Sequence, residues 1–341
     1  MNDENDGVPA PRPLAGLTWR PITADDIDAW LLLEQELEKA DELSEHYSAE
    51  DLNDELFDGS WKDPVRDSLL GVDAEGVPWA FGCVDVRPGD TRSVRAFCWG
   101  GVHPDYRRRG VGAAVLAWQV ARGTQKIAEQ GKSAPGVLLS YCGDEAVDRK
   151  ALLTDAGFTP ARWYLDMTRP LRGDGAAPLP DVVLGSGLRL VPYDRDDRAL
   201  DEKVRLAHNE AFAGNWGSEP RSREDWERAT TGGRNFRPDW SFVVLDGDEV
   251  AGYTLTSAYE QDWAAQGYTS GWTDLLGVRP AWRRRGIAPA LLAAAMRAIA
   301  DSGIDRAELN VDSENDDGAL GLYQRLGYDV VHREIAWAKH V

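Results

Sequence analysis

The chain has 341 residues, a length that suits two domains of about 150 residues better than a single core. Apolar residues make up 43% of it and 14 residues are tryptophan, so each half can bury a core and a disordered chain is excluded. The net charge of −20 argues against nucleic acid as a partner; it fits a cationic small substrate or simply an acidic surface.

The start of the chain is acidic and has no apolar signal core, and no run of residues is long and apolar enough to cross a membrane. The cysteines Cys83, Cys98 and Cys142 lack metal-ligand spacing, which is typical of unpaired thiols in a reducing compartment. We expect Cys98 and Cys142 to pack in buried strands. These features predict a cytoplasmic protein without a membrane partner, with residues 1–16 as a disordered tail.

The first half, residues 17–169, alternates between the hydrophobic periods of strands and of helices. Thr23, followed by acidic residues, predicts the start of the first helix. The expected order is strand, two helices, three strands, helix, strand, helix and strand, over residues 17–22, 23–45, 48–57, 68–72, 79–86, 94–102, 111–130, 137–141, 144–156 and 163–167.

Residues 170–186 have the Gly and Pro content of an interdomain linker, and the pattern then restarts. The same order of elements is expected over residues 188–191, 196–212, 222–230, 242–245, 250–256, 269–278, 287–299, 307–311, 318–326 and 330–337. The second domain therefore spans residues 187–341. We predict two tandem copies of one α/β fold, each a mixed sheet with helices on both faces.

One stretch occurs twice, each time between a predicted strand and a predicted helix. It reads Gly-Val-His-Pro-Asp-Tyr-Arg-Arg-Arg-Gly-Val-Gly at 101–112 and Gly-Val-Arg-Pro-Ala-Trp-Arg-Arg-Arg-Gly-Ile-Ala at 277–288. Backbone N–H groups at a helix start bind phosphate oxygens, arginines can add charge-assisted bonds, and small residues allow close approach. Neither the P-loop nor the dinucleotide-binding motif fits. Each copy therefore predicts a pyrophosphate site.

Both halves resemble the GNAT superfamily of N-acetyltransferases, whose acetyl-CoA motif is Gln/Arg-x-x-Gly-x-Gly/Ala after the fourth strand. Each half matches this motif after a Val-x-Pro sequence, with Arg107, Gly110 and Gly112, then with Arg283, Gly286 and Ala288. In its tandem plan the chain is similar to the mycothiol synthase family of that superfamily. The resemblance implies acetyl-CoA as co-substrate and no metal.

The resemblance also implies which residues contact acetyl-CoA. They come from the arginine loop, the strand before it and the segment after the fifth strand: Val102, Arg107, Arg109, Gly110 and Gly112 in the first half, and Leu276, Val278, Arg283, Arg284, Arg285, Gly286, Ile287, Ala288 and Asn315 in the second. Backbone amides near Leu276 and Val278 are expected to bind the thioester carbonyl oxygen.

Members of the superfamily commonly have an Asn after the fifth strand and a Tyr in the next helix, whose hydroxyl protonates the departing thiolate. The second half has Asn315 and Tyr323. When the two halves are aligned with each other, Glu145 and Leu153 of the first half fall at these positions. We therefore expect catalysis in residues 187–341. The first domain is expected to be structural, a degenerate CoA site or part of the substrate cleft.

The general base is less clearly marked. Many relatives have Glu six residues before the Val of Val-x-Pro, and that position here is Trp272. Asp274 lies two residues further along the same strand face and is our candidate. Glu260, Asp262 and a relayed water are the alternatives.

The expected reaction is direct transfer of the acetyl group to the primary amine of a small molecule. His208, Trp216 and Trp226 lie in the helical region where such enzymes build the acceptor pocket, with either packing or contact as their role. A role like that of mycothiol synthase and the modification of an antibiotic or metabolite are both compatible. The alternative is a non-catalytic acyl-CoA-binding or regulatory protein. The sequence does not identify the acceptor or the oligomeric state.

Overall fold

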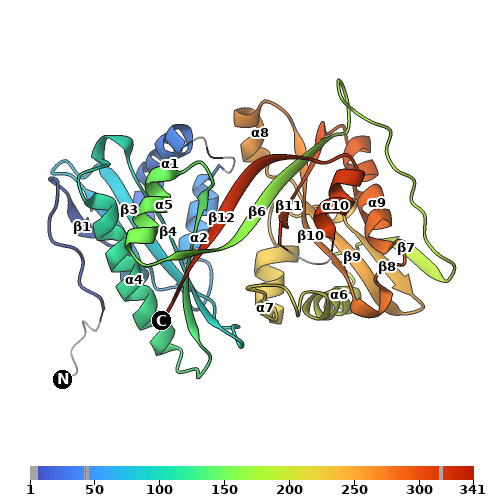
Figure 1. Cartoon of the computed structure of the whole chain (residues 1–341), viewed down its shortest axis with the longest axis horizontal. Helices are drawn as coiled ribbons and strands as arrows, with labels where there is room; N and C mark the ends of the chain where they lie inside the picture. Colours follow the sequence, from blue (N-terminus) through green and yellow to red (C-terminus); the bar gives the residue numbers. More distant parts are fainter. Residues whose placement is uncertain (1–6, 42, 44–45, 315–317) are drawn as a thin grey trace. The chain divides into compact units, whose positions relative to one another are not determined.

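The computed structural model of the chain describes residues 7–41, 43, 46–314 and 318–341 (Figure 1). It forms two compact units, unit 1 from Met1–Arg162 with Glu334–Val341 and unit 2 from Trp163–Arg333. Of the expected tail, residues 1–6 lie outside the described residues, and residues 7–16 contain no helix or strand beyond a β-bridge between Leu14 and Leu17. None of the described helices has both the length and the apolar character needed to cross a membrane.

Unit 1 is a mixed sheet with helices on both faces. Its elements are β1 (Thr18–Arg20), η1 (Ala24–Asp26), α1 (Ile27–Asp41), α2 (Ala49–Phe57), α3 (Pro64–Asp67), β2 (Ser68–Val72), β3 (Pro78–Val86), β4 (Val94–Val102), η2 (Pro104–Tyr106), α4 (Val111–Glu129), β5 (Gly136–Gly143), α5 (Val147–Asp155) and part of β12 (Asp329–His340). The strand order is β1-β2-β3-β4-β5-β12, with β4 and β5 parallel. Side chains of α1 and α2 pack on one face, and α4 packs on the other against Gly82.

Unit 2 repeats this plan, as the tandem prediction requires. Its elements are β6 (Thr159–Pro170, from residue 163), β7 (Leu188–Pro192), α6 (Arg198–Ala211), α7 (Arg223–Trp226), the π-helical turn η3 (Glu227–Thr231), η4 (Pro238–Trp240), β8 (Phe242–Asp246), β9 (Glu249–Ser257), α8 (Glu260–Gln266), β10 (Ser270–Val278), η5 (Pro280–Trp282), α9 (Ile287–Asp301), β11 (Arg306–Asp312) and α10 (Ala319–Arg325). The strand order is β6-β11-β10-β9-β8-β7. Helices α6 and α7 pack on one face and α9 on the other. The expected mixed α/β fold is confirmed.

The closing strand of the first half of the sequence, β6, belongs to the sheet of unit 2. The closing strand of the second half, β12, belongs to the sheet of unit 1. Residues 164–170 of β6 pair antiparallel with β11 in unit 2, and residues 334–340 of β12 pair antiparallel with β5 in unit 1. The compact units therefore differ at their ends from the expected domains, 17–169 and 187–341. An alternating pattern identifies a strand but not its partner, and two copies of one fold offer each closing strand two equivalent edges.

The contribution of the exchanged strand to unit 1 can be tested at Trp337. This side chain is 5% exposed, and its residue pairs with Ser140 of β5. We expect Trp337→Ala to lower the free energy of unfolding by about 3–5 kcal/mol, because it leaves a cavity. Hydrogen exchange should become faster in β5 and stay unchanged in β9. His340→Ala, at an exposed position of the same strand, is the control. Equal loss of protection in both units would contradict the assignment.

Candidate active site

The parallel strands β10 and β11 of unit 2 pair over only part of their length. Their register runs from Ser270 to Thr273 of β10 and then stops, although both strands continue. Strand β10 stays paired with β9 as far as Val278. Among the described residues, the edge of β10 that faces β11 therefore has no strand partner beyond Thr273.

Two backbone N–H groups of β10 point into this opening. The N–H of Arg279 donates to the carbonyl of Ala251 on β9 at 3.0 Å. Because N–H groups of successive residues in a strand point to opposite edges, those of Val278 and Leu276 are directed away from β9. They occupy the place where the sequence predicted donors for a carbonyl oxygen.

The arginine loop joins β10 to α9 through a backbone with two residues in the left-handed region. Arg284 has a φ of 62° and Gly286 a φ of 77°, and the first copy repeats this with 62° at Arg108 and 82° at Gly110. Gly286 places no side-chain cap on the helix. In the first turn the N–H groups of the buried Ile287 and the small Ala288 can therefore bind an anion, whereas Pro289 has no N–H and the N–H of Ala290 donates to the carbonyl of Gly286.

The three arginines of the second loop differ in the contacts that their side chains make. Arg283 donates from Nη2 to the carbonyl of Ala211 at 2.9 Å and from Nε to that of Val278 at 3.3 Å. Arg285 pairs with Asp246 at 3.3 Å. Arg284 is exposed, and its side chain has no hydrogen bond or ion pair within the described part of the chain. Arg283 therefore holds the loop in place, and Arg284 is the arginine best placed to meet a phosphate.

Asp274 is the extra residue of a bulge in β10, where the register with β9 shifts by one. Its Oδ2 accepts a hydrogen bond from Ser257 Oγ at 2.5 Å, and its Oδ1 accepts one from Tyr259 Oη at 2.9 Å. Ser257 lies two residues from Leu255, which packs under α6 and α7, so Asp274 is on this side of the sheet. Ser257 and Tyr259 carry no signal in the sequence, because their contact with Asp274 depends on the bulge.

Burial raises the pKa of Asp274 to about 6, while the hydrogen bonds from Ser257 and Tyr259 and the positive charge of Arg221 act to lower it. A carboxylate with a pKa near neutrality is suited to accept a proton. The alternative bases lie in α8, where Glu260 is paired with Arg237 at 2.7 Å. This ion pair makes Glu260 a weaker candidate than Asp274.

Tyr323 lies on α10 and is 8% exposed. Its ring centroid is 6.1 Å from that of Tyr328, and Leu276 of β10 packs against the hydrophobic cluster that contains both tyrosines. Its hydroxyl makes no hydrogen bond within the described residues, and burial raises its pKa to about 12, so it stays protonated at neutral pH. Asn315 lies outside the described residues.

The aromatic candidates of the α6–α7 region pack within the fold. The buried His208 shares a 2.6 Å hydrogen bond between Nδ1 and Tyr253 Oη, and burial lowers its pKa to about 3. Trp226 is buried and donates from Nε1 to Asp201 at 2.7 Å. Trp216 is half-buried in the turn after α6. His208 and Trp226 therefore support the sheet.

Unit 1 keeps the loop but not the groups around it. Arg107 donates to the carbonyl of Val102 at 2.9 Å and pairs with Asp41 at 2.6 Å, and Arg109 lies over the ring of Tyr106 at 5.1 Å. The register of β3 and β4 has no shift, and the position of Asp274 is taken by the buried Cys98. The small Gly112 follows Gly110 as in the motif.

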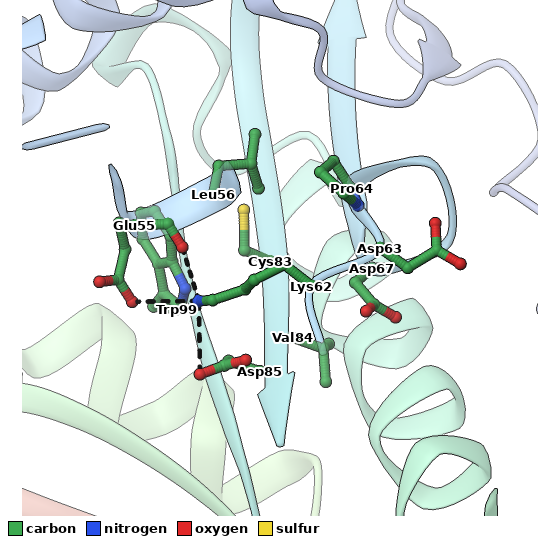
Figure 2. Close-up of a pocket in the computed structure, with 10 residues that line it drawn as sticks. All are labelled: Glu55, Leu56, Lys62, Asp63, Pro64, Asp67, Cys83, Val84, Asp85 and Trp99. Carbon is green, nitrogen blue, oxygen red and sulfur yellow. Dashed lines mark hydrogen bonds and ion pairs between the residues drawn. The ribbon is translucent and has the colours of Figure 1, made fainter. Parts of the chain in front are cut away.

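A small pocket of unit 1 lies between α2, α3 and the strands β3 and β4 (Figure 2). The ammonium group of Lys62 extends into it, donating to the carbonyl of Glu55 at 2.6 Å and pairing with Asp85 at 3.4 Å. A cation of the chain itself thus lines this pocket and is already paired there. Across the described residues, no three His, Cys, Asp or Glu side chains are grouped to hold a metal ion.

The model of the acetyltransferase (GNAT) family matches residues 202–328, which include β10, the loop and Tyr323. A mycothiol acetyltransferase from Thermobispora bispora is 32% identical over 246 residues, covering 68% of this chain and 74% of the relative. The chain belongs to the GNAT family of acetyltransferases. Another mycothiol acetyltransferase, from Kineococcus radiotolerans, is 29% identical over 338 residues, 97% of this chain and 98% of the relative.

The fold of this GNAT protein is also found in solved structures. A GCN5-related N-acetyltransferase from Sphaerobacter thermophilus matches it with a TM-score of 0.74 at 24% identity, over 96% of both chains. The likeness covers both units and so extends beyond the matched family segment. Family and relatives together make the protein an acetyl-CoA-dependent N-acetyltransferase.

Proposed function

We propose that this enzyme transfers the acetyl group of acetyl-CoA to a primary amine of a small molecule, with catalysis in unit 2. The observation that carries the proposal is Asp274, a half-buried carboxylate at the bulge of β10, on the strand whose N–H groups at Leu276 and Val278 point into the opening. Unit 1 has the loop but has Cys98 and Leu153 at the positions of the base and the acid.

In this proposal each group of unit 2 has one role. Asp274 takes a proton from the attacking amine, directly or through a water molecule. The N–H groups of Leu276 and Val278 stabilise the negative charge that develops on the thioester oxygen. Tyr323 gives its proton to the departing CoA thiolate. The loop from Arg283 to Ala288 holds the pyrophosphate.

The first acceptor to test is the amine that mycothiol acetyltransferases acetylate, because a relative with this name matches the chain over 97% of its length. Release of CoA thiol should be measured with that amine and with a panel of amino sugars and amino-containing metabolites. We expect turnover with at least one amine and none with the corresponding alcohols. Tight binding of acetyl-CoA without turnover of any amine would instead favour a non-catalytic acyl-CoA-binding protein.

The proposed role of Arg284 predicts a change in affinity. We expect Arg284→Ala to weaken acetyl-CoA binding about 2–5-fold, and more at low salt, because it removes an exposed cation beside the phosphates. Calorimetric titration measures the affinity for acetyl-CoA. The kcat at saturating acetyl-CoA, measured separately, should stay unchanged. Arg195→Ala, which removes an exposed arginine before α6, is the charge-matched control. Equal effects of the two variants would mean that only net charge matters.

A further inference from the structure

Unit 1 contains the counterpart of the opening between β10 and β11. Strands β4 and β5 pair from Val94 to Phe97 of β4 and no further, although both strands continue. The N–H of His103 donates to β3 at 2.8 Å. By the alternation of a strand, the backbone groups of Val102 and Gly100 therefore point to the β5 side. Gly100 stands at the position of Leu276, so this is where a thioester carbonyl would be bound.

A side chain of α5 occupies this opening. Arg149 donates from Nη1 to the carbonyl of Gly100 at 2.8 Å and from Nη2 to Ser140 Oγ on β5 at 3.3 Å. Its guanidinium group therefore bridges the two strands beyond the point where their pairing ends. Burial lowers the pKa of Arg149, as expected for a cation held away from water.

The corresponding position of unit 2 has no such side chain. Leu153 aligns with Tyr323, so Arg149 of α5 aligns with Ala319 of α10. A methyl group cannot bridge β10 and β11. The two openings therefore differ in that an arginine occupies one of them.

We propose that Arg149 closes the opening of unit 1 to the thioester arm of acetyl-CoA, so that the chain binds one acetyl-CoA, in unit 2. This inference rests on the proposed function of unit 2. To admit the arm, the guanidinium would have to leave the carbonyl of Gly100 and the hydroxyl of Ser140, and a buried charge without partners is strongly unfavourable. We expect the affinity of unit 1 to be on the order of 100-fold or more below that of unit 2.

Calorimetric titration of the full chain with acetyl-CoA tests the stoichiometry. We expect one site per chain in the wild type and a second site in Arg149→Ala. Lys150 follows Arg149 in α5 and pairs with Asp144. The Lys150→Ala variant, which also removes a cation, should keep one site. Two sites of similar affinity in the wild type, or a folded Arg149→Ala protein with one site, would overturn the inference and leave the proposed function intact.

Hydrogen exchange of the wild-type chain gives a second test that needs no variant. Acetyl-CoA should protect the amides of 283–288 and leave those of 107–112 unchanged. Protection of both loops would contradict the inference alone. No binding to either loop would contradict the proposed function, and with it the single site in unit 2.

Discussion

Replacing Asp274 by Asn should lower kcat/KM for the amine by about 10²–10⁴-fold, the usual contribution of a general base. Acetyl-CoA binding should change little, because Asp274 lies outside the arginine loop. The pKa of Asp274 is near 6, and only the ionised carboxylate accepts a proton. The wild-type kcat/KM should therefore fall as the pH drops below about 6. Initial rates from about pH 5 to about pH 9 measure both effects, and the Asn variant should lose this acid limb.

The alternative bases provide the controls for this prediction. Glu260→Gln and Asp262→Asn make the same kind of change in α8 and should retain most of the activity. A wild-type pH profile in Asp274→Asn would remove Asp274 from the mechanism. A loss of activity confined to one of the α8 variants would assign the base to that residue.

Replacing Tyr323 by Phe should lower kcat by about 10²-fold or more and leave the KM for acetyl-CoA nearly unchanged. The substitution keeps the ring that packs in the core and removes only the hydroxyl, whose proton the leaving thiolate needs. Steady-state kinetics at saturating acetyl-CoA measure the effect. The thermal unfolding midpoint should stay close to that of the wild type, because this hydroxyl has no hydrogen bond within the described residues.

Tyr328→Phe is a closely matched control for Tyr323→Phe. The two rings are neighbours in one cluster, and the hydroxyl of Tyr328 is buried with no hydrogen-bond partner among the residues that the structure describes. We expect this variant to keep its activity and to be at least as stable as the wild type. Equal losses of kcat in both variants would show that the effect comes from the core, and full activity of Tyr323→Phe would refute its role as the acid.

Most of the fold could be predicted because each long element carries its own hydrophobic period. The helix that begins at Ile287 and the strand that enters the arginine loop are clear examples. The short helices α3 and α8, of 4 and 7 residues, were not predicted, since so few residues show little of a helical period; α10 is as short as α8 but was expected from the repeated order of elements. The partners of the exchanged strands could not be predicted either, because pairing depends on residues far away in sequence.

The candidate site divides in the same way. The loop is a local feature, so its arginines and glycines could be found from a short motif, whereas the left-handed backbone at Arg284 could not, because arginine rarely adopts it. The bulge at Asp274 depends on the pairing of β10 with β9, and the hydroxyl groups of Ser257 and Tyr259 reach Asp274 only through it. The position of Arg149 between two strands is likewise set by tertiary structure. The sequence therefore indicated the candidate groups, but not which of them make hydrogen bonds or ion pairs with other parts of the fold.

The exchange of closing strands has a consequence for how the protein is made. Unit 2 is one continuous stretch, so it can fold as soon as residue 333 leaves the ribosome. Strand β5 is made much earlier but pairs with residues 334–340. At a synthesis rate of about 5–20 residues per second, the edge of β5 stays unpaired for roughly 10–40 s. An unpaired strand edge can pair with other chains and cause aggregation. The half that is translated first is therefore completed last, and a nascent chain that stops a few residues early leaves unit 1 open beside a finished unit 2.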